Sequence, residues 1–136
     1  MHPFHLAIPV DDLAAARHFY GQVLGCPEGR SSEHWIDFDM EGHQLVVHLR
    51  PDHPRPEKNP YTVSEVPIPH FGVCMDRPAW DALAKRLQDA NARFLVEPVI
   101  RNPGEHSEQA TLFVEDPAGN ALEFKAMKDP AMLFQA

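Results

Sequence analysis

Two histidines and one glutamate are the residues of this chain best suited to do chemistry together. The segment His5-Leu-Ala-Ile-Pro-Val-Asp11 is followed 65 residues later by the similar segment His70-Phe-Gly-Val-Cys-Met-Asp76, and Glu123 lies late in the second half. Two neutral imidazoles and one carboxylate suit a divalent first-row metal ion that keeps open coordination positions. Such an ion can polarise a substrate oxygen or activate dioxygen. The sequence therefore predicts a metal site built from both halves.

The similarity of the two half-chains predicts a duplicated unit of one strand, one helix and three further strands, because the period is longer than that of solenoid repeats. In the first unit Asp11 is predicted to cap a helix through Leu24, which Gly25 ends. The other elements expected there are a strand at about 3–10, a short segment through Arg30, and a hairpin of residues 34–40 and 44–50 with Glu41-Gly42 as its turn.

The second unit has the same predicted order. Asp76 caps a helix that Pro78 opens, and Trp80, Leu83, Ala84 and Leu87 form its apolar stripe. Strands are expected at 93–97, 109–115 and 121–126, with a polar loop at 101–108 and a turn at 116–120. A proline-rich connector, residues 51–67, should separate module 1 (about 3–50) from module 2 (about 68–127), all within a single domain of residues 1–136.

Strand alternation places the candidate ligands on one face of each predicted sheet, because successive side chains point to opposite sides. In the three strands that carry His5, His70 and Glu123, the apolar residues lie on the opposite face, and small residues flank the ligands. That pattern is typical of a cavity floor. In the fourth strand Gln44 and His48 share the cavity side, so His48 is a candidate fourth ligand and Gln44 a weaker one.

Composition excludes several classes of protein. The chain has 136 residues and a net charge of -8, which disfavours surfaces for nucleic acid or anionic membranes. It has two cysteines, no charged and apolar leader at its start, and no apolar run of about 20 residues. We therefore expect a soluble cytoplasmic protein with free thiols whose partner is a small molecule or another copy of itself.

Two stretches of the chain resemble the vicinal oxygen chelate superfamily, which includes glyoxalase I, type I extradiol dioxygenases, fosfomycin-resistance transferases and bleomycin-binding proteins. The first runs from His5 to Tyr20 and on through Val23-Leu-Gly25, and the second is Asp116-Pro-Ala-Gly-Asn-Ala-Leu-Glu-Phe124. The resemblance extends to about Lys125. It implies an α+β fold of two βαβββ modules whose curved mixed sheets surround a metal-binding cavity.

The resemblance also implies metal ligands at His5, His70 and Glu123, and a fourth-strand position near His48. Extradiol dioxygenases usually use three ligands, and glyoxalase I, which commonly has Glu at the fourth position, uses four. We therefore expect one divalent ion, with Fe(II) favoured over Ni(II), Zn(II), Co(II) or Mn(II). An extradiol dioxygenase-like enzyme that binds vicinal substrate oxygens is the first expectation, and a glyoxalase-like isomerase or lyase is the alternative.

Other roles stay open at the level of sequence. His48 is explained equally well as a ligand, as a support for a ligand, or as a substrate contact. Trp35, Arg50 and Phe113 are candidate substrate contacts on the cavity side. A metal-free protein that binds a drug or metabolite, as bleomycin-binding relatives do, is the hypothesis from another class, and a fosfomycin-type transferase ranks third. The superfamily pairs modules within one chain or between two, so a homodimer is expected.

Overall fold

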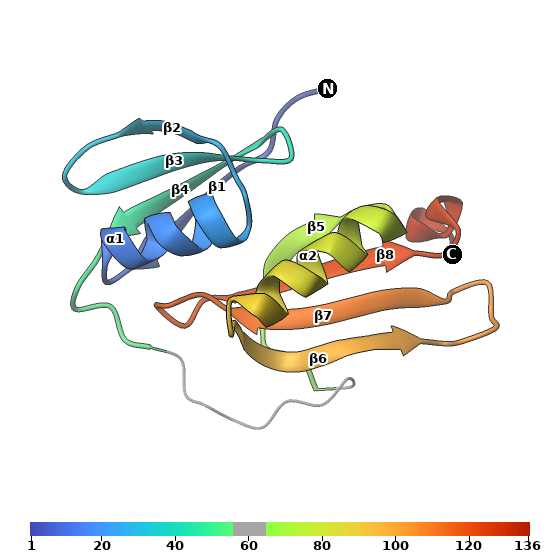
Figure 1. Cartoon of the computed structure of the whole chain (residues 1–136). Helices are drawn as coiled ribbons and strands as arrows, with labels where there is room; N and C mark the ends of the chain where they lie inside the picture. Colours follow the sequence, from blue (N-terminus) through green and yellow to red (C-terminus); the bar gives the residue numbers. More distant parts are fainter. Residues whose placement is uncertain (56–64) are drawn as a thin grey trace. The chain divides into compact units, whose positions relative to one another are not determined.

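A computed structural model describes residues 1–55 and 65–136 of the chain (Figure 1). Residues 56–64, and with them most of the connector predicted at 51–67, lie outside the described residues. The chain divides into two compact units. The described part of the first comprises residues 1–55 and 116–120, and that of the second comprises residues 65–115 and 121–136. The single domain expected over residues 1–136 stays a prediction.

The first unit contains a four-stranded mixed sheet with the order β1-β4-β3-β2. Strand β1 pairs in parallel with β4, and the other pairs are antiparallel. A short α-helix, α1, continues directly into a π-helix, η1, that contacts the sheet. The elements are β1 His5–Val10, α1 Leu13–Ala16, η1 Arg17–Val23, β2 Glu28–Ser31, β3 Trp35–Met40 and β4 His43–Leu49. The turn between β3 and β4 is Glu41-Gly42, as expected, with positive φ at both residues.

The second unit repeats this arrangement with the strand order β5-β8-β7-β6, in which β5 and β8 are parallel. Helix α2 covers one face of this sheet (Figure 1). The elements are β5 Phe71–Cys74, α2 Arg77–Asp89, β6 Arg93–Arg101, β7 Gln109–Glu115, β8 Ala121–Met127 and a 3-10 helix, η2, Pro130–Phe134. The predicted pair of βαβββ modules in an α+β fold is therefore confirmed. Strand β6 extends four residues beyond its predicted end, and η2 lies in the tail that had no predicted structure.

The start of the first helix differs from the prediction by one residue. Asp12, not Asp11, is the N-cap, because its Oδ1 accepts a hydrogen bond of 3.0 Å from the Ala15 amide. Asp11 instead forms an ion pair of 2.6 Å with Arg55. Two adjacent aspartates made the cap ambiguous in sequence. In α2 the predicted cap is confirmed, since Asp76 accepts from the Ala79 amide at 2.8 Å.

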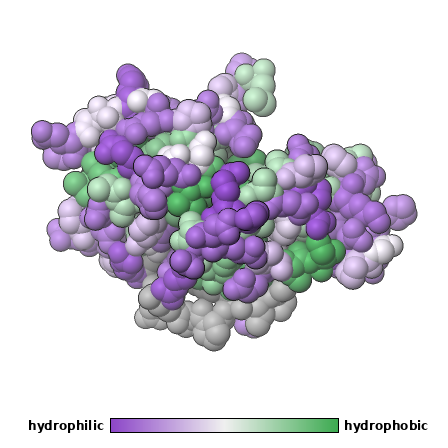
Figure 2. Space-filling view, in the orientation of Figure 1, coloured by the Kyte–Doolittle hydropathy of each residue, from purple (hydrophilic) through white to green (hydrophobic). Residues whose placement is uncertain are grey.

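The helix-facing sides of the two sheets form the core of each unit. In β8 Leu122, Phe124 and Ala126 are buried and the intervening residues are partly exposed, as strand alternation requires. The predicted stripe of α2, including Trp80 and Leu87, is buried as well. The face in Figure 2 is mostly hydrophilic. Among the described residues, every helix is too short or too polar to span a bilayer.

Candidate metal and substrate site

The second unit brings two of the predicted ligands together. His70 directly precedes β5, Glu123 lies in the adjacent strand β8, and the distance from His70 Nε2 to Glu123 Oε1 is 3.3 Å. Both side chains are largely buried, with 23% and 13% of their surface exposed. Parallel pairing of β5 with β8 is what joins residues 53 positions apart in the chain.

Hydrogen bonds outside this pair set the orientation of the His70 ring. Its Nδ1 lies 2.7 Å from the carbonyl oxygen of Pro67, which can only accept, so Nδ1 carries the proton. In the neutral ring Nε2 therefore presents a lone pair towards Glu123. Two electron pairs that face each other in this way require a proton or a cation between them. A metal-binding histidine typically donates its other ring N–H to a carbonyl or carboxylate, and the bond from His70 to Pro67 has this form.

Thr111 and Phe113, both on β7, support the same pair. The hydroxyl of Thr111 donates a hydrogen bond of 2.6 Å to Glu123 Oε2, so Oε1 is left to face His70. The ring of Phe113 packs edge-on against His70, with ring centroids 5.0 Å apart. Thr111 is fully buried and Phe113 is 2% exposed. Phe113 thus holds the His70 ring in place, and its predicted contact with substrate stays a prediction.

Gly72 allows the two ligand strands to approach each other. It is the register partner of Glu123, and a Cβ atom added to Gly72 would overlap the carbonyl oxygen of Glu123. Any larger residue would push β5 away from β8. The small residue predicted beside His70 therefore has a structural reason as well as opening space on this face.

In the first unit His5 has a comparable orientation. It is the register partner of Gln44 on β4, and His5 Nδ1 lies 2.7 Å from Gln44 Oε1. Because the amide oxygen accepts, His5 Nδ1 donates and Nε2 keeps its lone pair. Gln44, a weaker ligand candidate in the sequence, thus orients His5. The sequence carried no signal for this role, because it depends on the pairing of β1 with β4.

The pairing register also shows where His48 lies. His48 is opposite Pro9, four positions along β1 from His5 and about 13 Å away at the rise of a strand. In the 65-residue repeat, Gly72 corresponds to Ala7, so the position that corresponds to Glu123 is Val46, the partner of Ala7. Valine cannot bind a metal ion. The role of His48 as a fourth ligand stays a prediction.

The two remaining residues that were predicted to contact substrate, Trp35 and Arg50, lie at different places in the first unit. Trp35 on β3 is the register partner of His48, and the guanidinium of Arg30 stacks on its ring at 5.9 Å. Arg50 follows β4 and donates to the Leu49 carbonyl. It lines a cavity of about 40 Å³ with Asp11 and other residues. Neither arrangement tests a contact with substrate, so both contacts stay predictions.

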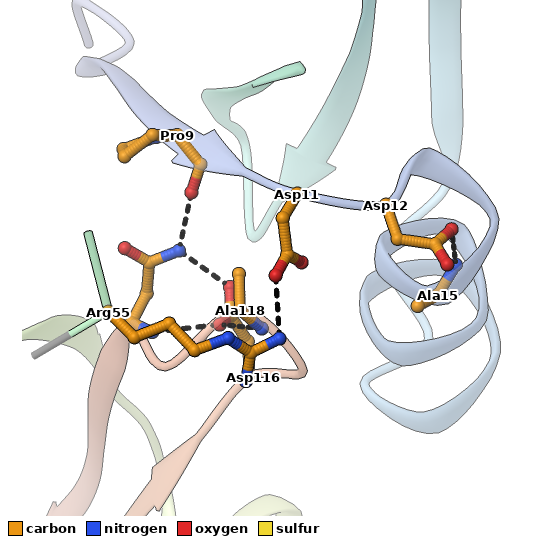
Figure 3. A network of polar contacts seen from close by, with 8 residues as sticks. Pro9, Asp11, Asp12, Ala15, Arg55, Asp116 and Ala118 are labelled. Atoms are coloured by element: carbon orange, nitrogen blue, oxygen red, sulfur yellow. Dashed lines mark hydrogen bonds and ion pairs between the residues drawn. The ribbon is translucent and has the colours of Figure 1, made fainter. Parts of the chain in front are cut away.

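A buried polar network supports the first unit close to that cavity. The Asp116 carboxylate accepts a hydrogen bond of 2.7 Å from the Tyr20 hydroxyl. It accepts another from the Asn120 side chain, which also donates to the Pro9 carbonyl (Figure 3). Burial, with the charge of Asp116 next, raises the pKa of Tyr20 well above 10. Tyr20 is therefore a neutral donor, and the network holds the turn of residues 116–120 against β1.

Among the described residues, no three His, Cys, Asp or Glu side chains gather closely enough to hold a metal ion. What each unit shows separately is a histidine whose Nδ1 has a hydrogen-bond partner: His70 in the second unit, beside Glu123, and His5 in the first unit, beside Gln44. The donor types, two imidazole nitrogens and a carboxylate, fit a divalent first-row ion.

Paired βαβββ modules define the class of protein. A family model described as Glyoxalase/Bleomycin resistance protein/Dioxygenase superfamily matches residues 2–124. The chain belongs to this superfamily, so the resemblance noted in the sequence is confirmed.

Solved structures agree with this assignment. The crystal structure of a glyoxalase/bleomycin resistance protein/dioxygenase from Alicyclobacillus acidocaldarius is 36% identical to this chain, with a TM-score of 0.82 over 98% of this chain and 96% of that one. The fosfomycin resistance protein FosX from Listeria monocytogenes is 13% identical, with a TM-score of 0.69 over 93% of each chain. A lactoylglutathione lyase from Agrobacterium tumefaciens is 19% identical, with a TM-score of 0.63 over 92% of each chain. The last two show the fold alone.

Proposed function

We propose that this protein is a metal-dependent enzyme, similar to extradiol dioxygenases, whose small substrate binds the metal ion through vicinal oxygens. The observation that carries the proposal is the His70–Glu123 pair. Its facing donor atoms, 3.3 Å apart, need a cation or a proton between them, and both side chains are held by outside hydrogen bonds. An exposed, freely rotating pair would not support the proposal.

The proposed ligands are His70, Glu123 and His5. The bond from His5 Nδ1 to Gln44 supports the inclusion of His5, because it leaves Nε2 available. Valine at position 46, which corresponds to Glu123 in the repeat, supports a set of three protein ligands over four. Three ligands leave more coordination positions for a chelating substrate, and a set of two histidines and one carboxylate is the one that non-haem Fe(II) oxygenases use.

When bound, a divalent ion supplies Lewis-acid polarisation of the substrate oxygens, and Fe(II) can in addition activate dioxygen. The chain itself positions the donors. Thr111 fixes the carboxylate of Glu123, Pro67 and Phe113 fix the ring of His70, and the low exposure of the pair limits the access of water.

A glyoxalase-like isomerase or lyase is the second candidate function. His48 favours it, because the part-buried imidazole lies on the same face of the first sheet as His5 and has no hydrogen bond to another described residue. As a fourth ligand His48 would suit Ni(II), Zn(II) or Co(II) in place of Fe(II).

Metal analysis by mass spectrometry tests the proposal. The protein should be purified anaerobically without an affinity tag, beside the variants His70→Ala, Glu123→Gln and His5→Ala. His106→Ala is the control, since His106 is exposed on the loop between β6 and β7. We expect one iron ion per chain in the wild type and the control, and a large loss in the other three variants.

The other outcomes are equally informative. Nickel, zinc or cobalt in the wild type would shift the proposal to the isomerase or lyase. A metal content that also falls in His48→Ala would add that residue to the ligands. No metal in the wild type, before or after reconstitution, would contradict both enzyme functions and favour a metal-free binding protein.

A further inference from the structure

Lys125 lies on the same face of the second sheet as the His70–Glu123 pair. It follows Glu123 by two residues in β8, and alternate residues of a strand point to the same side. Its register partners are Thr111 on β7 and Cys74 on β5. Because the Thr111 hydroxyl reaches Glu123, this row of side chains directly adjoins the candidate ligands.

The ammonium group of Lys125 has no carboxylate partner within the described part of the chain. Several other cations of this unit do: Arg93 pairs with Glu115 at 2.8 Å and Lys128 with Glu108 at 3.8 Å. Lys125 is partly buried, whereas the side chain of Lys128 is 63% exposed. A partly buried charge loses hydration and gains from a counter-ion. Glu123 is the nearby acid on this face, and both its oxygens are already engaged by His70 and Thr111.

The duplicated fold adds an independent observation. In the 65-residue repeat Cys74 corresponds to Pro9, and the partner of Pro9 is His48. Lys125 and His48 therefore occupy equivalent positions, each two residues beyond the position of Glu123 or its counterpart Val46. Both modules place a basic side chain at this point.

We propose that Lys125 recognises a carboxylate on the substrate, an inference that rests on the function proposed above. Glu123 and Lys125 are roughly 7 Å apart along the strand, at about 3.4 Å per residue. That separation is close to the distance from a phenolic oxygen, across the ring, to the oxygens of a carboxylate in the para position. The substrate class is a small carboxylate, such as a ring acid, whose chelating vicinal oxygens and carboxylate lie on opposite sides of the molecule.

Binding of two matched probes tests this assignment. 3,4-Dihydroxybenzoate and catechol share the vicinal oxygens and differ in the carboxylate. Their dissociation constants should be measured by calorimetry for wild type, Lys125→Met, Lys125→Arg and Lys128→Met, in metal-loaded and in EDTA-treated protein. Lys128→Met is the matched control, because it removes the same charge at the end of β8 from a lysine that is exposed and already paired.

We expect the wild type to bind the carboxylated probe about tenfold more tightly than catechol. A difference of this size in the dissociation constant corresponds to the contribution of one charge-assisted hydrogen bond. Lys125→Met should remove this preference and change the affinity for catechol less than twofold. Lys125→Arg and Lys128→Met should keep the preference.

Two results would overturn the assignment: a wild type with no preference for the carboxylate, including one that binds neither probe, or a preference that survives in Lys125→Met. Failure of the proposed function would give a different result in the same experiment. If the protein binds no metal but the EDTA-treated form shows a preference that depends on Lys125, the carboxylate site stands without the metal enzyme.

Discussion

At the scale of single residues, the candidate site depends on hydrogen bonds to atoms that do not themselves bind metal. Pro67, Gln44 and Thr111 each accept or donate one bond that sets which atom of a ligand is free. Types and spacing in the sequence identified the two histidines and the glutamate. They could not identify the three supporting residues. The contacts of Gln44 and Thr111 depend on how distant strands pair, and the contact of Pro67 depends on the path of the backbone just before β5.

Thr111→Val should weaken metal binding about 10- to 100-fold, the usual effect of losing such a supporting bond. Valine has nearly the shape of threonine and lacks the hydroxyl that donates to Glu123 Oε2. Competition with a chelating dye measures the affinity. Thr111→Ser keeps the hydroxyl and should stay within a few-fold of wild type. If the Thr111→Val variant and the wild type had equal metal affinities, Glu123 would need no support from Thr111.

At the scale of elements, periodicity predicted the strands and helices, and local rules predicted most of their ends. The turn at Glu41-Gly42, the cap at Asp76 and the stop at Gly25 are where the sequence indicated them. The predicted N-cap of the first helix was wrong by one residue. Asp11 and Asp12 have equal capping propensity, and the tertiary ion pair with Arg55 involves Asp11.

Asp12→Ala should lower the free energy of unfolding by about 1 kcal/mol, as expected for loss of an N-cap. The matched variant Asp11→Ala should cost between zero and about 1 kcal/mol, because the ion pair with Arg55 is exposed. Urea denaturation followed by circular dichroism compares the two. A larger loss in Asp11→Ala would contradict the assignment of the cap.

At the scale of the whole molecule, long-range polar contacts stabilise each unit in ways that no local pattern predicts. Tyr20 and Asp116 are 96 residues apart and form a buried hydrogen bond of 2.7 Å. The sequence predicted Tyr20 in the first helix and Asp116 in the turn of residues 116–120, and both lie there. The bond between them was not predicted. The expected homodimer also stays a prediction at this scale.

The buried Tyr20 predicts a pH dependence of stability. Its pKa is raised by burial and by Asp116, whereas in the unfolded chain it is about 10. Above about pH 10 the unfolded state releases a proton that the folded state retains, so this contribution to stability is complete below that pH and declines above it. Tyr20→Phe should cost about 1–3 kcal/mol at pH 8, because Asp116 loses a buried donor.

The difference between wild type and Tyr20→Phe in urea denaturation should therefore shrink from pH 8 to pH 11. Lysines also titrate in this range, but they do so in both proteins, so the difference isolates Tyr20. A constant difference over this range would contradict a raised pKa for Tyr20.

The sequence by itself determined the duplicated α+β architecture, the faces of the strands and the residue types of the candidate site. These follow from local periodicity, turn chemistry and the 65-residue repeat, all of which depend only on the order of residues along the chain. Only the tertiary structure decided the strand register, which pairs Gly72 with Glu123 and Pro9 with His48. Register depends on packing between distant segments, and a shift of one residue would turn each side chain to the other face.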